Sequence, residues 1–371
     1  MSQEILRSSR PFFSKADIAA ILLDLTKVLE EGRLRNGENL KKFEKMVSDY
    51  LGVRHAIALD SDSSALETVL QFYNVRAREV IVSTNSFISI PNSVLYAGGK
   101  IVFSDIRKET LSMDPLDLSK KVTDKTCGVI VTHIAGFPNP DLKEIQEICK
   151  CNNLFLIEDA AHALGAVVSS QKVGTFGDAA IFAFTPTKVV TTGEGGMLVT
   201  NNAALADYTR LYSYYGSGPG KTNFVNLGRH MMLPEISSIL GIYQMKRIEE
   251  FVTRRNQIAD IYNEAFNQIS GLTTVGVSKN SRCSYYKYPL ILDSDLNKLK
   301  IQNSLLNSKV ETGTVFYPPC HMQPVYCSQT KDLTLPNAEE VLPRTITLPM
   351  HTALTDQDVS HVVDSVKGAI D

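Results

Sequence analysis

The run Leu154-Phe-Leu-Ile157, which ends directly in Glu158-Asp159, is the stretch of sequence that decides the fold. Its four residues are all apolar and lack the in–out alternation of a strand that has one face in water. Such a strand is buried on both faces, which is typical of a mainly parallel sheet covered by helices. The acidic pair therefore stands at the carboxyl edge of a sheet, where ligands gather in open α/β folds.

Six other short apolar runs, several of which also lack this alternation, follow at residues 56–59, 79–82, 100–103, 128–132, 179–184 and 197–200. Amphipathic segments of helical length separate most of them, at residues 63–73, 88–97 and 141–151. Strands that alternate with helices indicate the α/β class. We expect a mainly parallel seven-stranded sheet between two layers of helices.

After Pro234, apolar residues repeat at helical spacing and predict one long helix that leads out of the sheet domain. From about Phe251 onward the pattern changes to helices with a few short strands. Short strands at 286–292 and 345–348 and a closing helix at 356–370 follow. We expect a large domain over residues 1–245 and a smaller α+β domain over residues 246–371. An amphipathic helix at 15–31 could pack on either domain, the small one included.

The composition and net charge indicate which kinds of binding partner the protein has. The 371 residues carry 38 Lys+Arg against 40 Asp+Glu, and 43% of them are hydrophobic. A net charge of −2 without basic runs argues against nucleic acid or a membrane surface as the main partner. Six scattered cysteines, none in C-x-x-C spacing, predict no metal site and a reduced environment. With no signal peptide and no apolar run long enough to span a bilayer, we expect a cytoplasmic protein that acts on small molecules.

The chemistry that the sequence predicts depends on Asp159 and Lys188. Lys188 stands four residues after the apolar run that ends near Phe184, and a glycine-rich stretch, Gly193-Glu-Gly-Gly196, follows it. Alone, Asp159 could cap a following helix and Lys188 could be a solvated surface lysine. Together they are the two groups that a pyridoxal phosphate site needs. The amine holds the cofactor aldehyde, and the carboxylate keeps the pyridine nitrogen protonated. The glycines would let the backbone pass close to a ligand.

These residues resemble the DegT/DnrJ/StrS sugar aminotransferases, pyridoxal phosphate (PLP) enzymes of fold type I. The resemblance runs almost end to end and rests on Gly37-Glu-Asn-Leu-Lys-Lys-Phe-Glu44, Tyr96-Ala-Gly98, Ile157-Glu-Asp-Ala-Ala-His-Ala-Leu-Gly-Ala166, Lys188 with Gly193-Glu-Gly-Gly196, His321-Met-Gln-Pro324 and Thr347-Leu-Pro-Met350. It implies that Lys188 is the Schiff-base lysine and that Asp159 faces the pyridine nitrogen.

Further site residues follow from the resemblance. His162 stands where the family usually has a glutamine that contacts the ring hydroxyl; a packing role three residues into a helix is the alternative. Phe87 matches the aromatic residue that stacks on the cofactor ring, against a simple core role. His321 and Thr185 match the substrate side. Cys320, beside His321, could suggest a nucleophile or ligand, but no base or metal set is spaced around it.

The phosphate-binding positions depart from the family pattern. The aligned run is Asp60-Ser61-Asp62-Ser63-Ser64, in which Asp62 replaces a glycine and puts a like charge near the phosphate, unless it points away. Ser63 and Ser64 can still donate hydrogen bonds. Ala183 stands where a serine is usual. The segment that reaches the neighbouring subunit's site has His230 for an asparagine and Met232 for an arginine.

The resemblance implies a homodimer with its active site at the interface, which uses PLP, and its pyridoxamine phosphate form, to move an amino group from glutamate to a nucleotide-linked keto-deoxysugar. A sugar dehydratase of the same family is one alternative, but such members replace the lysine by histidine. A non-catalytic binding or regulatory relative is the other, and the intact Lys188 and Asp159 weigh against it.

Overall fold

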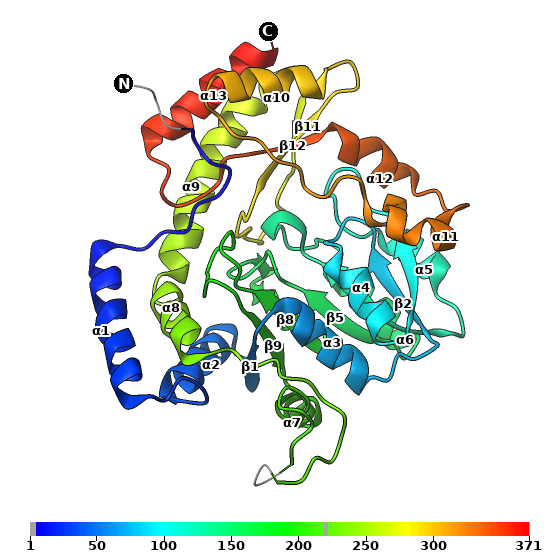
Figure 1. Cartoon of the computed structure of the whole chain (residues 1–371). Helices are drawn as coiled ribbons and strands as arrows, with labels where there is room; N and C mark the ends of the chain where they lie inside the picture. Colours follow the sequence, from blue (N-terminus) through cyan, green and yellow to red (C-terminus); the bar gives the residue numbers. More distant parts are fainter. Residues whose placement is uncertain (1–4, 219–221, 371) are drawn as a thin grey trace.

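The computed structural model describes residues 5–218 and 222–370 (Figure 1). Residues 1–4, in the N-terminal segment where we expect no signal peptide, lie outside that range. The main sheet has seven strands in the order β1-β9-β8-β5-β4-β2-β3. The strands are β1 (His55–Leu59), β2 (Glu79–Ser83), β3 (Lys100–Ser104), β4 (Thr126–Thr132), β5 (Phe155–Asp159), β8 (Ala179–Ala183) and β9 (Gly196–Thr200). All seven predicted strands are present, and β9 alone runs antiparallel to its neighbours in this sheet.

Helices cover both faces of this sheet, as predicted (Figure 1). Alternate strand residues supply the two faces: Ile57 and Leu59 pack into one core, and Ala56 and Ala58 into the other. The first core is closed by α3 (Asp62–Phe72), α4 (Ser89–Tyr96) and α7 (Ala203–Tyr212). The second is closed by α2 (Glu38–Leu51), α5 (Pro115–Lys121), α6 (Leu142–Cys151) and α8 (Glu235–Met245). Burial on both sides explains the unbroken apolar runs in the sequence.

The segment after Pro234 is two helices, so the prediction of one long helix is wrong. α8 ends at Met245, and α9 (Ile248–Phe266) begins after a break at which Arg247 leaves helical geometry, with φ −111° and ψ 4°. At the break the Arg247 side chain turns to the first helix, α1 (Lys15–Glu31): its Nε lies 2.5 Å from Asp17, and it donates to the Ser14 hydroxyl at 2.9 Å.

Helix α1 lies against α8 rather than against the C-terminal part of the chain (Figure 1). Its buried residues Ile21 and Val28 pack on Ile239. Tyr243 of α8 also donates a hydrogen bond to Asp24 at 2.8 Å. The structure thus places this helix mainly on α8, within residues 1–245, with the contacts of Arg247 just beyond them.

The C-terminal part has a three-stranded antiparallel sheet, β10 (Leu272–Thr274), β11 (Tyr288–Leu292) and β12 (Thr345–Leu348). β10 was not predicted, since three residues carry too little pattern. α10 (Lys298–Asn307), α11 (Cys327–Thr330), α12 (Pro336–Val341) and α13 (Asp356–Ile370) accompany this sheet, and a two-stranded ribbon, β6 (Val167–Val168) and β7 (Gln171–Lys172), follows β5. The division at residues 245/246 stays a prediction.

Candidate active site

A cavity of about 330 Å³ opens at the carboxyl edge of the main sheet. Its lining comes from the ends of β5 and β8, from the starts of α3 and α4, and from two segments of the C-terminal part. It is lined by Asp62, Phe87, Ser89, Ile90, Asp159, Ala161, His162, Ala183, Thr185, Thr187, Lys188, Tyr286, Lys287 and Phe316. Six of the predicted site residues thus meet in one place: Asp62, Phe87, Asp159, His162, Thr185 and Lys188.

Asp159 reaches this cavity because it is the last residue of β5. Strand alternation turns its neighbour Glu158 to the opposite face, where Glu158 accepts hydrogen bonds from the backbone amides of Gly174, Phe176 and Gly177 at 2.7–2.9 Å. Asp159 accepts one hydrogen bond from the Thr132 hydroxyl at 3.1 Å and another from the amide of Ala161 at 3.2 Å. Burial and the nearby Asp62 carboxylate raise the pKa of Asp159 to about 6. The raised pKa means that the protein disfavours the charged carboxylate, and a cation placed beside it would stabilise that charge.

The segment after Asp159 forms two tight turns instead of a helix. The amide of Ala163 donates to the carbonyl of Ala160, and that of Ala166 to the carbonyl of Ala163. Gly165 adopts φ +89° and packs so closely that a Cβ there would lie 2.6 Å from Val252. Both expectations that relied on a helix here are wrong: Asp159 caps none, and His162 does not lie within one.

His162 is held as a hydrogen-bond donor toward the cavity. Its Nδ1 accepts from the backbone amide of Ala135 at 3.2 Å, so the proton of the neutral ring is on Nε2. The ring stacks between Tyr286 and Phe316, with centroids 4.2 Å and 5.6 Å away. Burial, together with the cations Lys188 and Lys287, keeps the pKa of His162 well below its ordinary value. The imidazole is therefore neutral at physiological pH.

Lys188 lies in the turn that follows β8. Its amide donates to the carbonyl of Thr185 at 3.1 Å, and its Nζ lies 4.4 Å from the centre of the Tyr286 ring. Burial lowers the pKa of Lys188 to about 8, although Asp62 and Asp159 act in the opposite direction. Since Lys188 also lines the cavity and is only partly exposed, the alternative of a solvated surface lysine is disfavoured. An amine with this pKa is uncharged more often at neutral pH than an ordinary lysine, which suits a nucleophile.

The glycine-rich stretch makes close contacts within the protein, and its predicted approach to a ligand stays a prediction. A Cβ on Gly196 would lie 2.2 Å from the backbone nitrogen of Asp62, so this glycine lets β9 pass against the start of α3. Gly195 has φ +159°, and a Cβ there would lie 2.5 Å from the Thr192 hydroxyl. Gly196 thus allows the close approach between β9 and the start of α3.

Aromatic side chains frame the cavity. Phe87 is 54% exposed and lies with its ring centroid 5.6 Å from that of Phe316. The sequence did not single out Tyr286, Lys287 or Phe316. Tyr286 and Lys287 directly precede β11, and Phe316 lies between α10 and β12. All three are more than 100 residues away from Asp159 and lie within no motif. Thr187 adds a polar contact to Tyr286, with 3.0 Å between the two hydroxyl oxygens.

The start of α3 brings Asp62 into the cavity, so this carboxylate does not point away. Ser61 is the N-cap, and its hydroxyl accepts from the amide of Ser64 at 3.1 Å. The Ser64 hydroxyl is 2.9 Å from that of Ser61. Neither Ser63 nor Ser64 lines the cavity, although Ala183 does. Burial raises the pKa of Asp62, while Lys188 and the backbone amides of Asp62 and Ser63 lower it.

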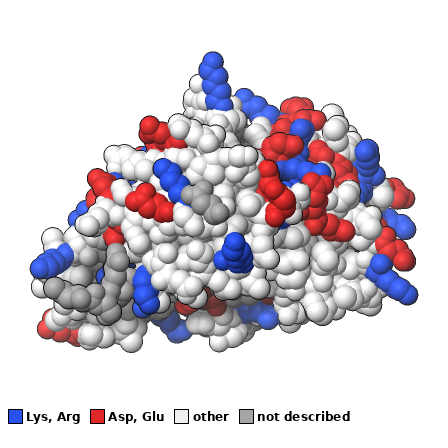
Figure 2. Space-filling view, turned by 90° about the horizontal axis from the view of Figure 1, so that it is seen from above, with Lys and Arg blue, Asp and Glu red and all other residues white. Residues whose placement is uncertain are grey.

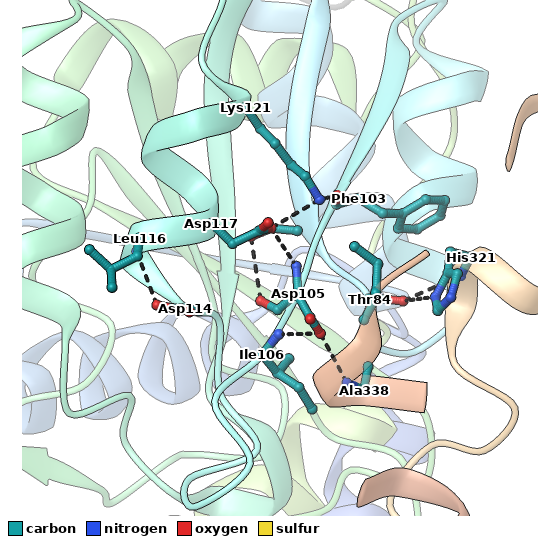
Figure 3. A network of polar contacts seen from close by, with 12 residues as sticks. Thr84, Phe103, Asp105, Ile106, Asp114, Leu116, Asp117, Lys121, His321 and Ala338 are labelled. Atoms are coloured by element: carbon teal, nitrogen blue, oxygen red, sulfur yellow. Dashed lines mark hydrogen bonds and ion pairs between the residues drawn. The ribbon is translucent and has the colours of Figure 1, made fainter. Parts of the chain in front are cut away.

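His321 does not reach this cavity. It is 3% exposed and lies in a short 3-10 turn (Cys320–Met322), where its Nδ1 is 2.6 Å from the Thr84 hydroxyl (Figure 3). Its Nε2 is 3.1 Å from the Glu339 carboxylate. Both ring nitrogens thus have protein partners, and the residue anchors its turn to the end of β2. The geometry does not support the predicted contact of His321 with substrate.

Figure 3 shows a related anchor beside this histidine. Asp105, after β3, accepts hydrogen bonds from the amides of Asn337 and Ala338 at the start of α12, at 3.0 Å and 2.9 Å. Cys320 is similarly structural: its thiol donates to the carbonyl of Ser86 at 3.1 Å, and burial raises its pKa to about 11. That pKa argues against a nucleophilic role.

His230 is exposed and does not line the cavity of its own chain. It pairs with Tyr214 in an isolated bridge, and its ring centroid lies 5.6 Å from that of Tyr215. Within residues 5–218 and 222–370, no helix is long and apolar enough to cross a membrane, and no three His, Cys, Asp or Glu side chains gather as a metal site. Figure 2 shows acidic and basic side chains interspersed over one face of the molecule.

The cavity fits the ring of PLP. An amine, a buried carboxylate and a neutral hydrogen-bond donor converge there, and they match the aldehyde, the ring nitrogen and the ring hydroxyl of that group. The exposed face of Phe87 offers a stacking surface. The phosphate end fits less well, because Asp62 and Ala183 offer a negative charge and a methyl group.

Proteins similar to this chain in sequence and in structure include sugar aminotransferases. The chain is 33% identical to the spore coat polysaccharide biosynthesis protein SpsC of Bacillus subtilis, over 98% of this chain and 96% of that protein. It is 31% identical to a GDP-perosamine synthase of Escherichia coli O157:H7, over 89% and 90%. The structure of Helicobacter pylori PseC, an aminotransferase of pseudoaminic acid biosynthesis, superposes with a TM-score of 0.93 over 99% of both chains at 27% identity. The DegT/DnrJ/EryC1/StrS aminotransferase family matches residues 16–367, and this chain belongs to that family.

Proposed function

We propose that this aminotransferase uses PLP to move an amino group from glutamate to a nucleotide-linked keto-deoxysugar. The observation that carries the proposal is the meeting of Lys188, Asp159 and His162 in one cavity. The substrate class is supported by relatives whose names specify GDP- and UDP-linked amino sugars.

The roles of the three residues follow from their surroundings. When bound, PLP supplies an aldehyde and an electron-accepting ring. Lys188 would bind the aldehyde carbon through Nζ and, once the donor's amine has released it, move a proton with the same nitrogen. Asp159 would oppose the positive charge of the ring nitrogen, and His162 would donate from Nε2 to the ring hydroxyl. Phe87 would cover one ring face, and Thr185 would contact the sugar.

Lys188 also separates the proposal from its enzyme rival. A dehydratase of this family would carry histidine at this position, whereas the structure has a buried lysine amine in the cavity. The non-catalytic alternative is disfavoured because Lys188 lines the cavity together with Asp159 and His162. Its lowered pKa of about 8 is typical of an amine at a functional site. The test is incubation with glutamate and a panel of nucleotide keto-sugars, followed by mass spectrometry. An aminated sugar that disappears with Lys188→Ala supports the proposal. A deoxygenated product, or no product with any member of the panel, contradicts it.

We also propose a homodimer in which His230 reaches the neighbouring subunit's cavity. Three large apolar side chains beside it are exposed: Phe224 (63%), Val225 (59%) and Leu227 (93%). A contiguous apolar segment of this kind usually marks an interface. We expect Leu227→Arg to be monomeric by light scattering and to lose activity, while Leu299→Arg, on the exposed side of α10, stays dimeric and active. A dimeric Leu227→Arg protein would place the interface elsewhere.

Two further expectations accompany this function. Tyr286, Lys287 and Phe316 belong to residues 246–371, which supports a division of labour in which the first 245 residues hold the cofactor and the remainder closes over the sugar. All six cysteines are free, four of them buried, which suits the cytoplasm.

A further inference from the structure

Asp62 puts a carboxylate into the cavity before any ligand is bound. It is the first residue of α3, and it lines the cavity together with Lys188 and Asp159. Strand β9 packs closely against the backbone of Asp62, since a Cβ on Gly196 would lie 2.2 Å from the Asp62 nitrogen. The α3 terminus therefore has little freedom to move the carboxylate out by a backbone shift.

The cavity is already neutral in charge without a phosphate group. Its lining has two cations, Lys188 and Lys287, and two anions, Asp62 and Asp159. Lys287 is engaged by the backbone, because its Nζ donates to the carbonyl of Thr314 at 2.7 Å. Of the two carboxylates, Asp62 exerts the larger electrostatic effect on Lys188. A dianionic group would enter a site whose positive charge is already matched.

The sheet order determines which end of the cavity a phosphate arm would enter. In PLP the hydroxyl and the phosphate arm occupy the two ring positions that flank the aldehyde-bearing carbon, so they point to opposite sides. His162, held by Ala135 after β4, lies on the β4 side of β5. α3 follows β1, and β8 and β9 lie between β1 and β5. A ring oriented by Lys188, Asp159 and His162 would therefore direct its phosphate arm toward Asp62 and Ala183.

Helix N-termini bind one anion well, because free backbone amides and the helix dipole face it. At α3 the amide of Ser64 is already used by the Ser61 hydroxyl, and the backbone amides of Asp62 and Ser63 lower the pKa of the Asp62 carboxyl. The methyl group of Ala183 offers no hydrogen bond in compensation. A phosphate at this terminus would thus compete with the chain's own carboxylate and be repelled by it.

We propose that Asp62 acts as an internal anion at the phosphate end of the cavity, so that the protein gains little or no affinity from the phosphate group of its cofactor. This inference rests on the proposed function, since it assumes that the ring binds at Lys188, Asp159 and His162. It makes Asp62 a residue that sets cofactor specificity, without a part in the chemistry.

The test compares PLP with pyridoxal, which has the same ring and aldehyde but no phosphate. Equilibrium binding of each compound to cofactor-free protein is followed by absorbance or by quenching of tyrosine fluorescence, without any turnover assay. We expect the wild type to bind the two compounds within about threefold of each other. Asp62→Asn, which keeps the side-chain shape and removes the charge, should tighten PLP binding by about tenfold or more and leave pyridoxal unchanged.

Asp60→Asn is the matched control, because it removes an exposed carboxylate two residues away that does not line the cavity. It should leave both affinities as in the wild type. Unchanged pyridoxal affinity in Asp62→Asn also shows that the variant is folded. If pyridoxal binds but the ratio of the two affinities is the same in wild type and Asp62→Asn, this inference is overturned and the proposed function stands. If neither compound binds either protein, both fall.

Discussion

Replacing Asp159 by asparagine should stabilise the cofactor-free protein while it harms catalysis. The carboxylate is buried at the end of β5, and its pKa is raised from 3.8 to about 6. Because the folded state binds this proton more tightly than the unfolded chain, the stabilising contribution is complete below the unfolded pKa and is lost as pH rises to 6 and beyond. A shift of about 2 pKa units corresponds to a cost on the order of 3 kcal/mol at pH 8.

Asparagine keeps the shape of the side chain and avoids that cost. Its Oδ1 can still accept from the amide of Ala161, and the Thr132 hydroxyl can rotate to accept from the new amide group. With an unfolding entropy of roughly 2.1 cal/mol/K per residue, 3 kcal/mol raises the melting temperature by about 4 °C at pH 8. At pH 5 the gain should fall to about half, because the wild-type carboxyl is then mostly protonated when folded.

The assay is thermal unfolding of cofactor-free wild type and Asp159→Asn at pH 5 and pH 8. Amino transfer by the variant should fall on the order of a hundredfold, since no anion opposes the ring nitrogen. Thr132→Val removes one hydrogen bond to the same carboxylate and keeps its charge, so it should not reproduce the stabilisation. Equal or lower stability of Asp159→Asn at pH 8, or a gain independent of pH, would refute the electrostatic reasoning.

Three other predictions test single contacts. Gly37→Ala should cost about 2–3 kcal/mol in chemical unfolding, because its Cβ would lie 2.5 Å from the Glu235 carboxyl, which accepts the amide of Gly37 at 2.7 Å; a neutral result would show that α2 can shift. His321→Leu should lower the melting temperature by a few degrees and change the KM for the sugar less than about threefold, since its partners are Thr84 and Glu339. A large rise in KM at unchanged stability would restore it as a substrate ligand. His162→Gln should keep most of the kcat that His162→Leu loses, about tenfold or more, because glutamine retains a donor; equal losses would contradict the assigned hydrogen bond.

The seven strands of the main sheet were predictable because each contains a short run of apolar residues, and all but the edge strand β3 are buried almost throughout. Asp159 and Lys188 were predictable for a related reason. The strands fix where each run ends, and the carboxyl edge of a sheet is where ligands bind. Once the family resemblance was added, the phosphate-end departures at Asp62 and Ala183 were also visible in the sequence.

Other features depend on contacts that no local pattern encodes. Ala160 to Ala166 has the composition of a helix, but close packing of Gly165 on Val252 imposes turns. The helix after Pro234 breaks at Arg247 where that side chain reaches Asp17, 230 residues earlier. Tyr286 and Phe316, which hold the His162 ring, are brought to the site only by the tertiary fold.

The direction of Asp62 was likewise open from sequence alone. A residue at the start of a helix can face solvent or the neighbouring loop, and residue type does not choose between them. In the structure Asp62 lines the cavity beside Lys188.

Borohydride reduction of the cofactor-supplemented protein, followed by peptide mapping, tests the central claim most directly. Reduction converts a reversible lysine–aldehyde linkage into a stable one that survives proteolysis. We predict a single phosphopyridoxyl adduct, on the peptide that contains Lys188, and its loss in Lys188→Ala but not in Lys41→Ala, an exposed lysine of α2. Absence of an adduct on Lys188, or an adduct that persists elsewhere in Lys188→Ala at full stoichiometry, would contradict the account.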